Sequence, residues 1–396
     1  MTSGIIAPIQ ALRGIAASAV LLWHAGRYFG ADGAALARVL QPGAVMGVDL
    51  FFLVSGFIMV HATRDSDGSP GYVAEFLVKR VVRIWPLWLI ALAAMLAVLG
   101  DATYFTDATR REWLLRSLVF LPTAGVSADV PPIYGAPVLG VGWTLNYEMY
   151  FYAFFGLSML AGRWRWAAFS FWVIASVLLF PLLGGKLDAT GWFDFLAVDR
   201  NYHYAIQYLN LATNPLVLLF VAGALIGLVH HSRLPPLRRR GVALALVGFS
   251  CAAVAVQFVL AFRPYHGVSQ WGITLIPLLM AVSLASRSVE LRVPRWLSWL
   301  GDISFSLYLL HPIVLTAVFA VIHDYRFAPL AAIAGILLSV ATAALSHRWI
   351  ERGLSDALRT WMLARMGSKA DRAGSRVPAI SNPLTRSSTS LPSPDA

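Results

Sequence analysis

Runs of about 20 apolar residues recur along most of this chain, and each is long enough to cross the hydrocarbon core of a bilayer as a helix. Only 13% of the residues are charged, whereas soluble domains carry about 25%. These features predict an all-α, polytopic integral membrane bundle of about ten transmembrane helices. The ten runs lie at about 7–29, 43–62, 81–99, 140–161, 166–184, 214–230, 241–262, 270–286, 303–322 and 328–347.

The net charge of +11 does not form one basic patch, because the Lys and Arg residues alternate between successive loops. This distribution argues against binding of nucleic acid. With the N-terminus placed in the cytoplasm, 21 of the 31 Lys and Arg residues fall in inner segments and nine in outer segments. The excess of positive charge on the inner side predicts that both termini are cytoplasmic. Part of that charge is expected to contact anionic membrane lipids.

Composition also divides the chain into two parts. Residues 1–352 form the predicted membrane domain, and residues 353–396 form a predicted cytoplasmic tail that is basic and rich in Ser and Pro. The tail has too few bulky apolar residues to bury a core, so we expect it to be largely disordered. The single cysteine, Cys251, excludes a disulfide within the chain. The sequence lacks the zinc-binding HExxH motif, and we expect no metal site.

Two ionisable residues, Arg13 and His24, lie within the first apolar run. Eleven residues of helix make three turns and about 20° more, so both side chains point the same way, about 16 Å apart along the axis. A charge inside the bilayer costs at least ~2.5 kcal/mol on insertion scales, so it usually has a function. The pair therefore predicts a polar site inside the membrane.

Asp49 lies at the outer end of the second run, in the segment GVDLFFLVSGFIM at 47–59. The loop between the first two runs is short, so we expect Asp49 to lie close to His24. A carboxylate in that place would fix the imidazole tautomer and support it as a general base. The alternative is that Asp49 is a residue at a helix start, favoured there by the helix dipole.

Arg80 and Arg83 stand at the inner start of the third run, in KRVVRIWP at 79–86. Residues three apart share one face of a helix. Two neighbouring guanidinium groups can bind phosphates bidentately, as a cytoplasmic acyl-CoA would require. The alternative is that the pair only anchors the helix at the positively charged inner surface.

Glu148 opens the fourth run from the outer side, in GWTLNYE at 142–148. The acid lies among Trp and Tyr residues. Aromatic rings with one carboxylate are typical of carbohydrate pockets, where the rings stack on sugars and the carboxylate binds hydroxyl groups. A structural salt bridge is the alternative.

The ninth run begins with the segment DISFSLYLLHP at 302–312. Ser304, Tyr308 and His311 are spaced four and three apart and form one polar stripe on an apolar helix. We expect this stripe to face the interior of the bundle. His311 is either a second acid–base group or a histidine whose hydrogen bonds are satisfied within the core.

These five segments, in this order and across residues 5–352, resemble the integral membrane acyltransferases of family three. Members of that family O-acylate bacterial surface polysaccharides, and the exopolysaccharide-production acetyltransferases are the nearest type. The resemblance implies a multi-pass protein of the bacterial cytoplasmic (inner) membrane. It implies acyl-CoA, with acetyl-CoA the first expectation, as a co-substrate and not as a resident cofactor. The implied acceptor is a hydroxyl of a polysaccharide or lipid-linked oligosaccharide.

The resemblance also implies roles for these residues. His24 and Arg13 are expected to be essential, and Arg80 and Arg83 to bind the donor. Glu148 and the segment from Tyr308 to His311 are expected to build the remaining site. His24 would either take the proton of the attacking hydroxyl or carry the acyl group itself, with Asp49 or Glu148 as support.

The chain departs from the family at one motif, and two other classes of function stay open, a glycan transporter and a membrane glycan polymerase or glycosyltransferase. Many members have Ile-Glu-Arg-Pro near the last run, whereas this chain has Ile350-Glu351-Arg352-Gly353, which weakens a specific role for Glu351. A transporter or flippase of lipid-linked glycans would also use many spans and buried charges. Such proteins usually show repeated halves, and we find no internal repeat.

Overall fold

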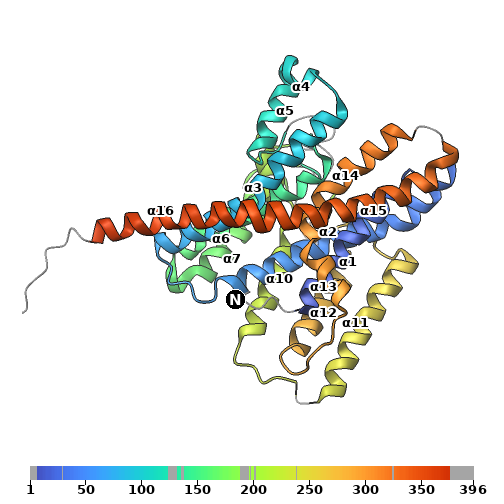
Figure 1. The fold of residues 1–396 in the computed structure, drawn as a ribbon. Helices are drawn as coiled ribbons and strands as arrows, with labels where there is room; N and C mark the ends of the chain where they lie inside the picture. The colour runs from blue at the N-terminus through green and yellow to red at the C-terminus, as the bar shows by residue number, and fades with distance from the viewer. Residues whose placement is uncertain are drawn as a thin grey trace, which may run out of the picture.

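The computed structural model describes residues 7–28, 30–123, 132–134, 138–187, 196, 198–199, 202–237, 239–322 and 325–374, and within these ranges the architecture is helical (Figure 1). The α-helices are α1 (Ala7–Gly26), α2 (Gly30–Ala62), α3 (Pro70–Leu99), α4 (Thr103–Thr106), α5 (Ala108–Leu118), α6 (Trp143–Met159), α7 (Arg165–Ile174), α8 (Phe180–Leu183), α9 (Gln207–Thr213), α10 (Val217–His231), α11 (Arg240–Leu260), α12 (Gly272–Ala285), α13 (Arg295–Asp302), α14 (Ser304–Val321), α15 (Ala328–Ser346) and α16 (Asp356–Gly374). Shorter 3₁₀ or π segments are η1 (Gly140–Gly142), η2 (Gly162–Trp164), η3 (Ala175–Leu179), η5 (Tyr325–Phe327) and η6 (His347–Ser355).

Six segments of the described chain are long and apolar enough to cross a membrane by themselves. The pair α9 and α10, bent by 45°, adds a seventh if it is one broken span. The prediction of a polytopic helical membrane protein is therefore confirmed, whereas the count of ten and the cytoplasmic placement of both termini stay predictions. The six segments are Arg38–Ala62, Pro70–Leu99, Gly162–Leu183, Arg240–Leu260, Ser304–Val321 and Ala328–Met366.

Three predicted runs form helices that do not meet this length and hydropathy test. The run at 7–29 forms α1, which carries Gln10, Arg13 and His24. The runs at 140–161 and 270–286 form α6 and α12, which are only 17 and 14 residues long. Polar side chains and short length thus explain the difference between ten expected runs and the smaller number of segments that qualify.

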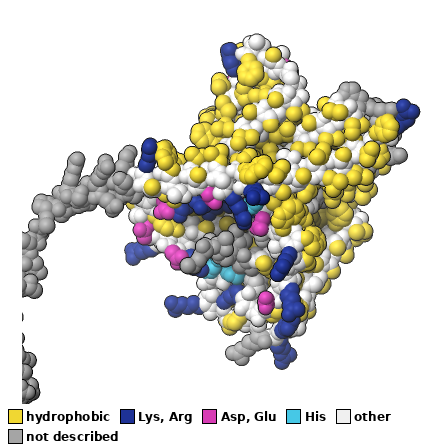
Figure 2. All heavy atoms as spheres, in the orientation of Figure 1, with side chains coloured by type: hydrophobic (Ala, Val, Ile, Leu, Met, Phe, Trp, Pro, Cys, Tyr) yellow, Lys and Arg dark blue, Asp and Glu magenta, His cyan; other side chains and the backbone are white. Residues whose placement is uncertain are grey.

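The molecular surface separates apolar from charged side chains. Figure 2 shows hydrophobic side chains covering much of the visible face, while Lys, Arg, Asp and Glu gather in a band beside α16. Helix α11 is mostly exposed, and large apolar residues such as Phe249 and Val259 are 76% and 78% exposed. An apolar exterior of this kind suits a lipid environment, in which only backbone groups bonded within their own helix are stable.

Helix α2 lies at the centre of the bundle, where it packs against α1 and α10. The crossing with α10 is so close that a Cβ atom on Gly56 would lie 2.0 Å from the backbone oxygen of Phe220. On the other side, a Cβ on Gly223 would lie 1.9 Å from the backbone oxygen of Leu53. Small residues that permit such close approach drive helix association in membranes.

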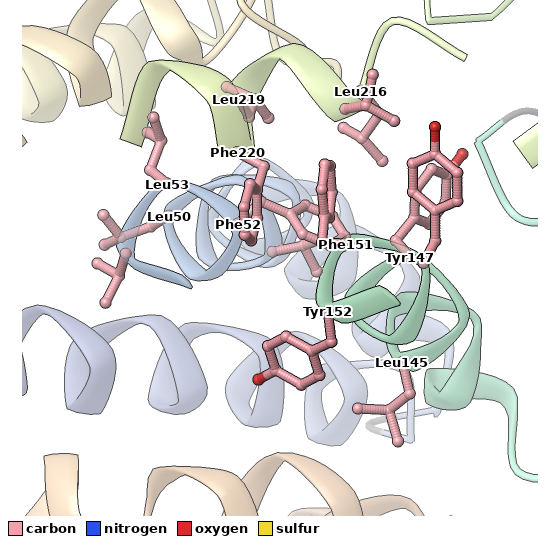
Figure 3. Packing of buried hydrophobic residues seen from close by; sticks show 14 of the residues in the cluster. Leu50, Phe52, Leu53, Leu145, Tyr147, Phe151, Tyr152, Leu216, Leu219 and Phe220 are labelled. Atoms are coloured by element: carbon pink, nitrogen blue, oxygen red, sulfur yellow. The ribbon is translucent and has the colours of Figure 1, made fainter. Parts of the chain in front are cut away.

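Aromatic and aliphatic side chains complete this core between α2, α6 and α10 (Figure 3). The rings of Phe151 and Phe220 are stacked, with centroids 3.7 Å apart. Tyr152, the next residue of α6, points away from this stack (Figure 3). One side of α6 therefore packs into the apolar core, and the other side carries polar groups toward the site described below.

Helix α3 has defined ends that fix the position of its arginines. Ser69 caps the N-terminus, because its hydroxyl oxygen accepts a hydrogen bond from the backbone N–H of Tyr72 at 3.1 Å. Pro70 occupies the first turn, where its missing N–H costs nothing. Gly100 ends the helix with φ = 61°, and its N–H donates to the oxygen of Leu96.

The helix continues without interruption across the domain boundary that the sequence predicts at residue 352. Helix α15 continues through the π-helical η6 into α16, which ends at Gly374, as one long helix in Figure 1. The first half of the predicted tail, 353–374, is therefore helical. The disorder expected for 375–396 falls outside the described residues, and the division at 352 stays a prediction.

We expect Gly223→Ala to destabilise the protein, because its new methyl group would overlap the backbone of α2. Overpacking of this kind costs about 1–3 kcal/mol. Gly248→Ala in α11 is the matched control, since no atom lies within 4 Å of its added Cβ. That change should be neutral or stabilising by up to ~1 kcal/mol. Thermal unfolding in detergent measures both, and equal midpoints for the two variants would contradict the packing described here.

Candidate functional site

A deep cavity lies among α1, α2, α3, α6 and α14. Its wall is apolar on the α2 side, where Phe51 and Phe52 contribute rings. Five residues singled out from the sequence also reach it, although they come from four different helices. These residues are Arg13, Arg80, Arg83, Glu148 and Tyr308.

A wider opening, here called the mouth, continues from this cavity. The two spaces share Ile58 and three arginines, Arg13, Arg80 and Arg83. Positive charge predominates in the mouth, on the side of the protein that the sequence predicts to be cytoplasmic. Its basic residues are Arg13, Arg64, Lys79, Arg80, Arg83, Arg352 and Arg359, and its acidic residues are Asp65, Glu75, Asp302, Glu351 and Asp356.

Arg80 is held by aromatic rings. Its guanidinium carbon lies 5.1 Å from the ring centroid of Phe76 and 5.5 Å from that of Tyr152. The buried Nε atom of Arg80 has no hydrogen-bond partner among the residues that the structure describes. A buried donor without a partner is costly, so this group is well placed to bind an anionic ligand.

Three hydrogen bonds hold the polar groups of the cavity and the mouth. The hydroxyl of Tyr152 donates to Oε1 of Glu148. Nη1 of Arg13 donates to Oε1 of Gln10 at 3.0 Å, and Nε2 of Gln10 donates to Oδ1 of Asp302 at 2.9 Å. Arg13 is only 8% exposed, and this relay fixes it at the junction of the cavity and the mouth.

His24 and His311 form a pair deeper in the bundle. Nδ1 of His311 lies 2.9 Å from the backbone oxygen of Leu307, which can only accept, so this nitrogen carries the proton. Nε2 of His311 then accepts a hydrogen bond from Nδ1 of His24 at 3.2 Å. Nδ1 of His24 also lies 2.9 Å from the oxygen of Val20. When both rings are neutral, Nδ1 of His24 carries the proton because it faces two acceptors, the oxygen of Val20 and Nε2 of His311. The lone pair of His24 is then on Nε2, where a base or nucleophile needs it.

Tyr308 separates the histidine pair from the deep cavity. Its hydroxyl lies 2.9 Å from Oγ1 of Thr144 and 3.2 Å from the backbone oxygen of Val141. Its ring lines the cavity on one side, and its centroid lies 6.2 Å from that of His311 on the other. We call this arrangement of Tyr308, Thr144 and Val141 the latch. Neither His24 nor His311 lines the cavity.

Asp49 does not contact His24, contrary to the expectation from the sequence. Its Oδ1 accepts a hydrogen bond from Nδ1 of His266 at 2.6 Å, and its Oδ2 accepts one from the backbone N–H of Gly267 at 2.9 Å. The register of α2 against α1 also differs from the expected one, because Gly43 and Gly47 pack on Ala19 and Ala16 and so place Asp49 near the level of Gly14. Gly47, two residues earlier, faces α1, where its Cβ would lie 2.6 Å from the oxygen of Ala16. Two residues rotate a helix by about 200°, so Asp49 points away from α1.

Sequence reasoning missed several residues of this region. Thr144 lies within the segment GWTLNYE, in which Glu148 is the one carboxylate and no pattern marks the threonine. Arg352 and Arg359 follow the expected domain boundary and still line the mouth. His266 lies in the loop between α11 and α12, where no periodic pattern marks it. Among the described residues, no group of three or more His, Cys, Asp or Glu side chains is arranged to hold a metal ion.

Comparisons with known proteins agree on one class. A family model described as an acyltransferase domain matches residues 6–348. The exopolysaccharide production protein ExoZ of Rhizobium meliloti is 32% identical over 274 residues, which cover 69% of this chain and 77% of the relative. The putative membrane-bound transacylase BcsY of Komagataeibacter xylinus is 26% identical over 373 residues, covering 90% and 85%.

A third relative, protein 2 in the picA locus of Rhizobium radiobacter, is 34% identical over 131 residues, which cover 29% of this chain and 63% of that protein. No solved structure matches the chain. The family match spans most of the sequence and includes the helices that build the deep cavity and the histidine pair. The chain therefore belongs to the integral membrane acyltransferases of family three and is an acyltransferase.

Proposed function

We propose that this membrane acyltransferase takes an acyl group, acetyl in the first instance, from cytoplasmic acyl-CoA. It transfers that group to a hydroxyl of a surface polysaccharide or of its lipid-linked precursor. The names of two relatives refer to exopolysaccharide production and to membrane-bound transacylation, which supports an acceptor of this class. The protein would act in the bacterial cytoplasmic membrane, with the donor on the inner side and the acceptor on the outer side.

One observation carries the proposal: a wide basic mouth leads into a deeper cavity that ends one tyrosine ring from a pair of histidines. Acyl-CoA has a matching shape, with a phosphate-bearing nucleotide head and a narrow, neutral arm that carries the thioester at its end. The phosphates would bind Arg80 and Arg83 bidentately. The arm would enter the apolar part of the cavity, and Arg13 would contact it at the junction.

His24 then acts on the acyl group by one of two routes. In the direct route, Nε2 of His24 takes the proton of the acceptor hydroxyl. The hydroxyl oxygen attacks the thioester carbon, and the C–S bond breaks to release CoA thiolate. In the covalent route, Nε2 attacks the thioester carbon first, and the C–S bond breaks to release CoA thiolate. The acceptor oxygen then attacks the acyl carbon, the bond from that carbon to Nε2 breaks, and the hydroxyl proton passes to the freed imidazole. In both routes His311 holds the tautomer of His24 through the contact at 3.2 Å.

The basic test uses the protein in proteoliposomes with radiolabelled acetyl-CoA and a surface polysaccharide stripped of its acyl groups by mild alkali. Label should move to the polysaccharide and become sensitive to alkali again. Transfer of the glycan across the membrane without label incorporation would instead favour a transporter, and the proposed reaction would be rejected.

Arg83→Ala should raise the KM for acetyl-CoA and leave the KM for the acceptor nearly unchanged. Loss of a charge-assisted hydrogen bond costs about 1.5–3 kcal/mol, or roughly 10- to 100-fold in KM. Arg163→Ala is the control, because Arg163 packs on Trp164 and lines neither space. Steady-state kinetics for both substrates decide the matter, and a selective rise in the acceptor KM would argue against the donor site proposed here.

His24→Ala and His24→Asn should both lower acyl transfer by about 100-fold or more, the usual contribution of a general base. The asparagine keeps a donor toward Val20 and His311 but has no counterpart of Nε2, so it separates chemistry from packing. Membrane levels and thermal midpoints serve as controls for folding. Transfer at the wild-type rate by either variant would remove His24 from the reaction.

Thr144→Val should loosen the latch, because valine has the shape of threonine but cannot bond to Tyr308. A single net hydrogen bond is worth about 0.5–1.5 kcal/mol. We therefore expect acceptor-independent hydrolysis of acetyl-CoA to rise roughly two- to tenfold relative to transfer. Thr144→Ser should restore the wild-type ratio.

Tyr150→Phe is the matched control for this experiment. It removes another buried hydroxyl from α6, one bonded to Ser176 at 2.8 Å and outside the cavity wall. Released CoA and labelled polysaccharide are measured in the same reaction. A parallel decline of both activities in Thr144→Val, with no change in their ratio, would mean that the hydroxyl only stabilises the fold.

A further inference from the structure

One wall of the mouth is formed by the long helix that runs from α15 through η6 into α16. Both η6 and α16 pack against α3, which carries Arg80 and Arg83. Arg352 and Ser355 of η6 line the mouth but not the deep cavity, whereas Arg80 and Arg83 line both spaces. The mouth therefore has a second polar wall, farther from the deep cavity, to which the mechanism above assigns no part of the donor.

Arg352 is an unpaired cation in this second wall. Other basic residues of the mouth belong to exposed ion pairs, which are Arg64 with Asp65, Lys79 with Glu75 and Arg359 with Asp356. Among the residues that the structure describes, Arg352 joins no ion pair and its side chain makes no hydrogen bond. A guanidinium group that is free on the wall of an opening can bind an anionic ligand, and its planar fork suits a phosphate.

Ser355 adds a buried hydroxyl group to the same wall. The residue is only 5% exposed, and its Oγ atom has no hydrogen-bond partner within the described part of the chain. Other hydroxyls of this long helix bond back to the carbonyl four residues earlier, as Ser339 does to Gly335 at 2.7 Å and Thr360 to Asp356 at 2.8 Å. Ser355 ends the π-helical segment, in which backbone bonds join residues five apart and the usual carbonyl is out of register. A buried donor without a partner is costly, so its hydroxyl is well placed to bind a ligand in the mouth.

Acyl-CoA carries phosphate at two separate places. A pyrophosphate joins the pantetheine arm to the nucleotide, and a phosphate monoester is attached to the 3′-oxygen of the ribose. With the arm in the deep cavity, the pyrophosphate lies at the junction beside Arg80 and Arg83, as proposed above. The ribose and its 3′-phosphate then lie farther out, in the part of the mouth that Arg352 and Ser355 line. The monoester carries close to two negative charges at neutral pH, and its oxygens accept hydrogen bonds from both of these side chains.

We propose that Arg352 and Ser355 bind the 3′-phosphate of the CoA donor; this inference rests on the proposed function. The guanidinium of Arg352 donates to the phosphate oxygens, and the hydroxyl of Ser355 donates to another oxygen of the same group. The pair makes the enzyme specific for free CoA thioesters. A thioester on a carrier protein is a poor donor, because its phosphopantetheine arm has no adenosine and no 3′-phosphate.

An anionic lipid offers the same chemistry, because phosphatidic acid also ends in a phosphate monoester. The assignment to CoA follows from the position of the pair, which lines the same opening as Arg80 and Arg83. The burial of Ser355 agrees with a ligand held inside the mouth. The experiment below therefore varies the donor and the lipid separately.

The test compares acetyl-CoA with acetyl-3′-dephospho-CoA as donors, using the protein in phosphatidylcholine liposomes and label transfer to alkali-treated polysaccharide as the readout. In the wild-type protein, the KM for the dephospho donor should be roughly 10- to 100-fold higher, because charge-assisted hydrogen bonds are lost. In Arg352→Ala, the KM for acetyl-CoA should rise toward that value, while the KM for the dephospho donor stays within about twofold. The ratio of the two KM values should therefore fall to about one, with kcat nearly unchanged.

Arg348→Ala is the matched control, because Arg348 is an exposed arginine of the same segment η6 and lines neither space. It should keep the wild-type ratio. Arg83→Ala should raise the KM for both donors by the same factor and also keep the ratio, because it acts at the pyrophosphate. Ser355→Ala should lower the ratio by roughly two- to tenfold, the effect of one hydrogen bond. It provides a second reading if Arg352→Ala cannot be purified.

Equal KM values for the two donors in the wild-type protein overturn the inference, and so does a wild-type ratio in Arg352→Ala. An effect of Arg352→Ala that appears only when phosphatidic acid is added to the liposomes assigns the pair to a lipid headgroup and overturns it as well. Each of these results leaves the proposed function intact as long as acetyl-CoA labels the polysaccharide. A wild-type protein that never labels it removes the proposed function, and the inference falls with it.

Discussion

The whole bundle is constrained by the absence of water around its buried ionisable groups. Lipid offers no hydrogen bonds, so each such group must find partners within the protein or remain very costly. Arg13 finds them through Gln10, and Asp49 through His266 and Gly267. The positions of these partners, together with close helix packing, decide where polar chemistry can occur.

Close contact between helices fixes the positions of these polar side chains. Gly56 and Gly223 bring the backbones of α2 and α10 together with no room for a side chain. Helix α2 is thus held in place, and its different faces contact different parts of the protein. One side presents Phe51 and Phe52 to the donor cavity, and another presents Asp49 to the loop that carries His266. A rotation of α2 would disturb both at once.

Much of the fold and part of the site could be predicted from the sequence. Apolar runs identified the helical membrane protein. Arg80 and Arg83, whose spacing puts them on one helix face, both line the same opening, and their binding of the donor stays a prediction. Tyr308 and His311 share a stripe as expected, yet the sequence did not show that the tyrosine shields the histidine. That relation depends on Thr144, which comes from a different helix 164 residues away in the chain.

The partner of Asp49 shows why the remainder could not be predicted. Position in an apolar run does not fix the register of two helices, and the direction of a side chain depends on how its helix is rotated. That rotation is set by tertiary contacts such as the one between Gly47 and α1. A carboxylate–imidazole pair was expected and is present, but with an imidazole from a loop that has no sequence signature.

The unbroken helix from α15 through η6 to α16 has a mechanical consequence. At 1.5 Å per residue it extends roughly 70 Å, more than twice the hydrocarbon thickness of about 30 Å. Its membrane segment and the two arginines at the mouth, Arg352 and Arg359, therefore belong to one continuous helix and move together. Bilayers of different thickness change the tilt of such a helix. The width of the substrate entrance would then vary with the lipid composition of the cell.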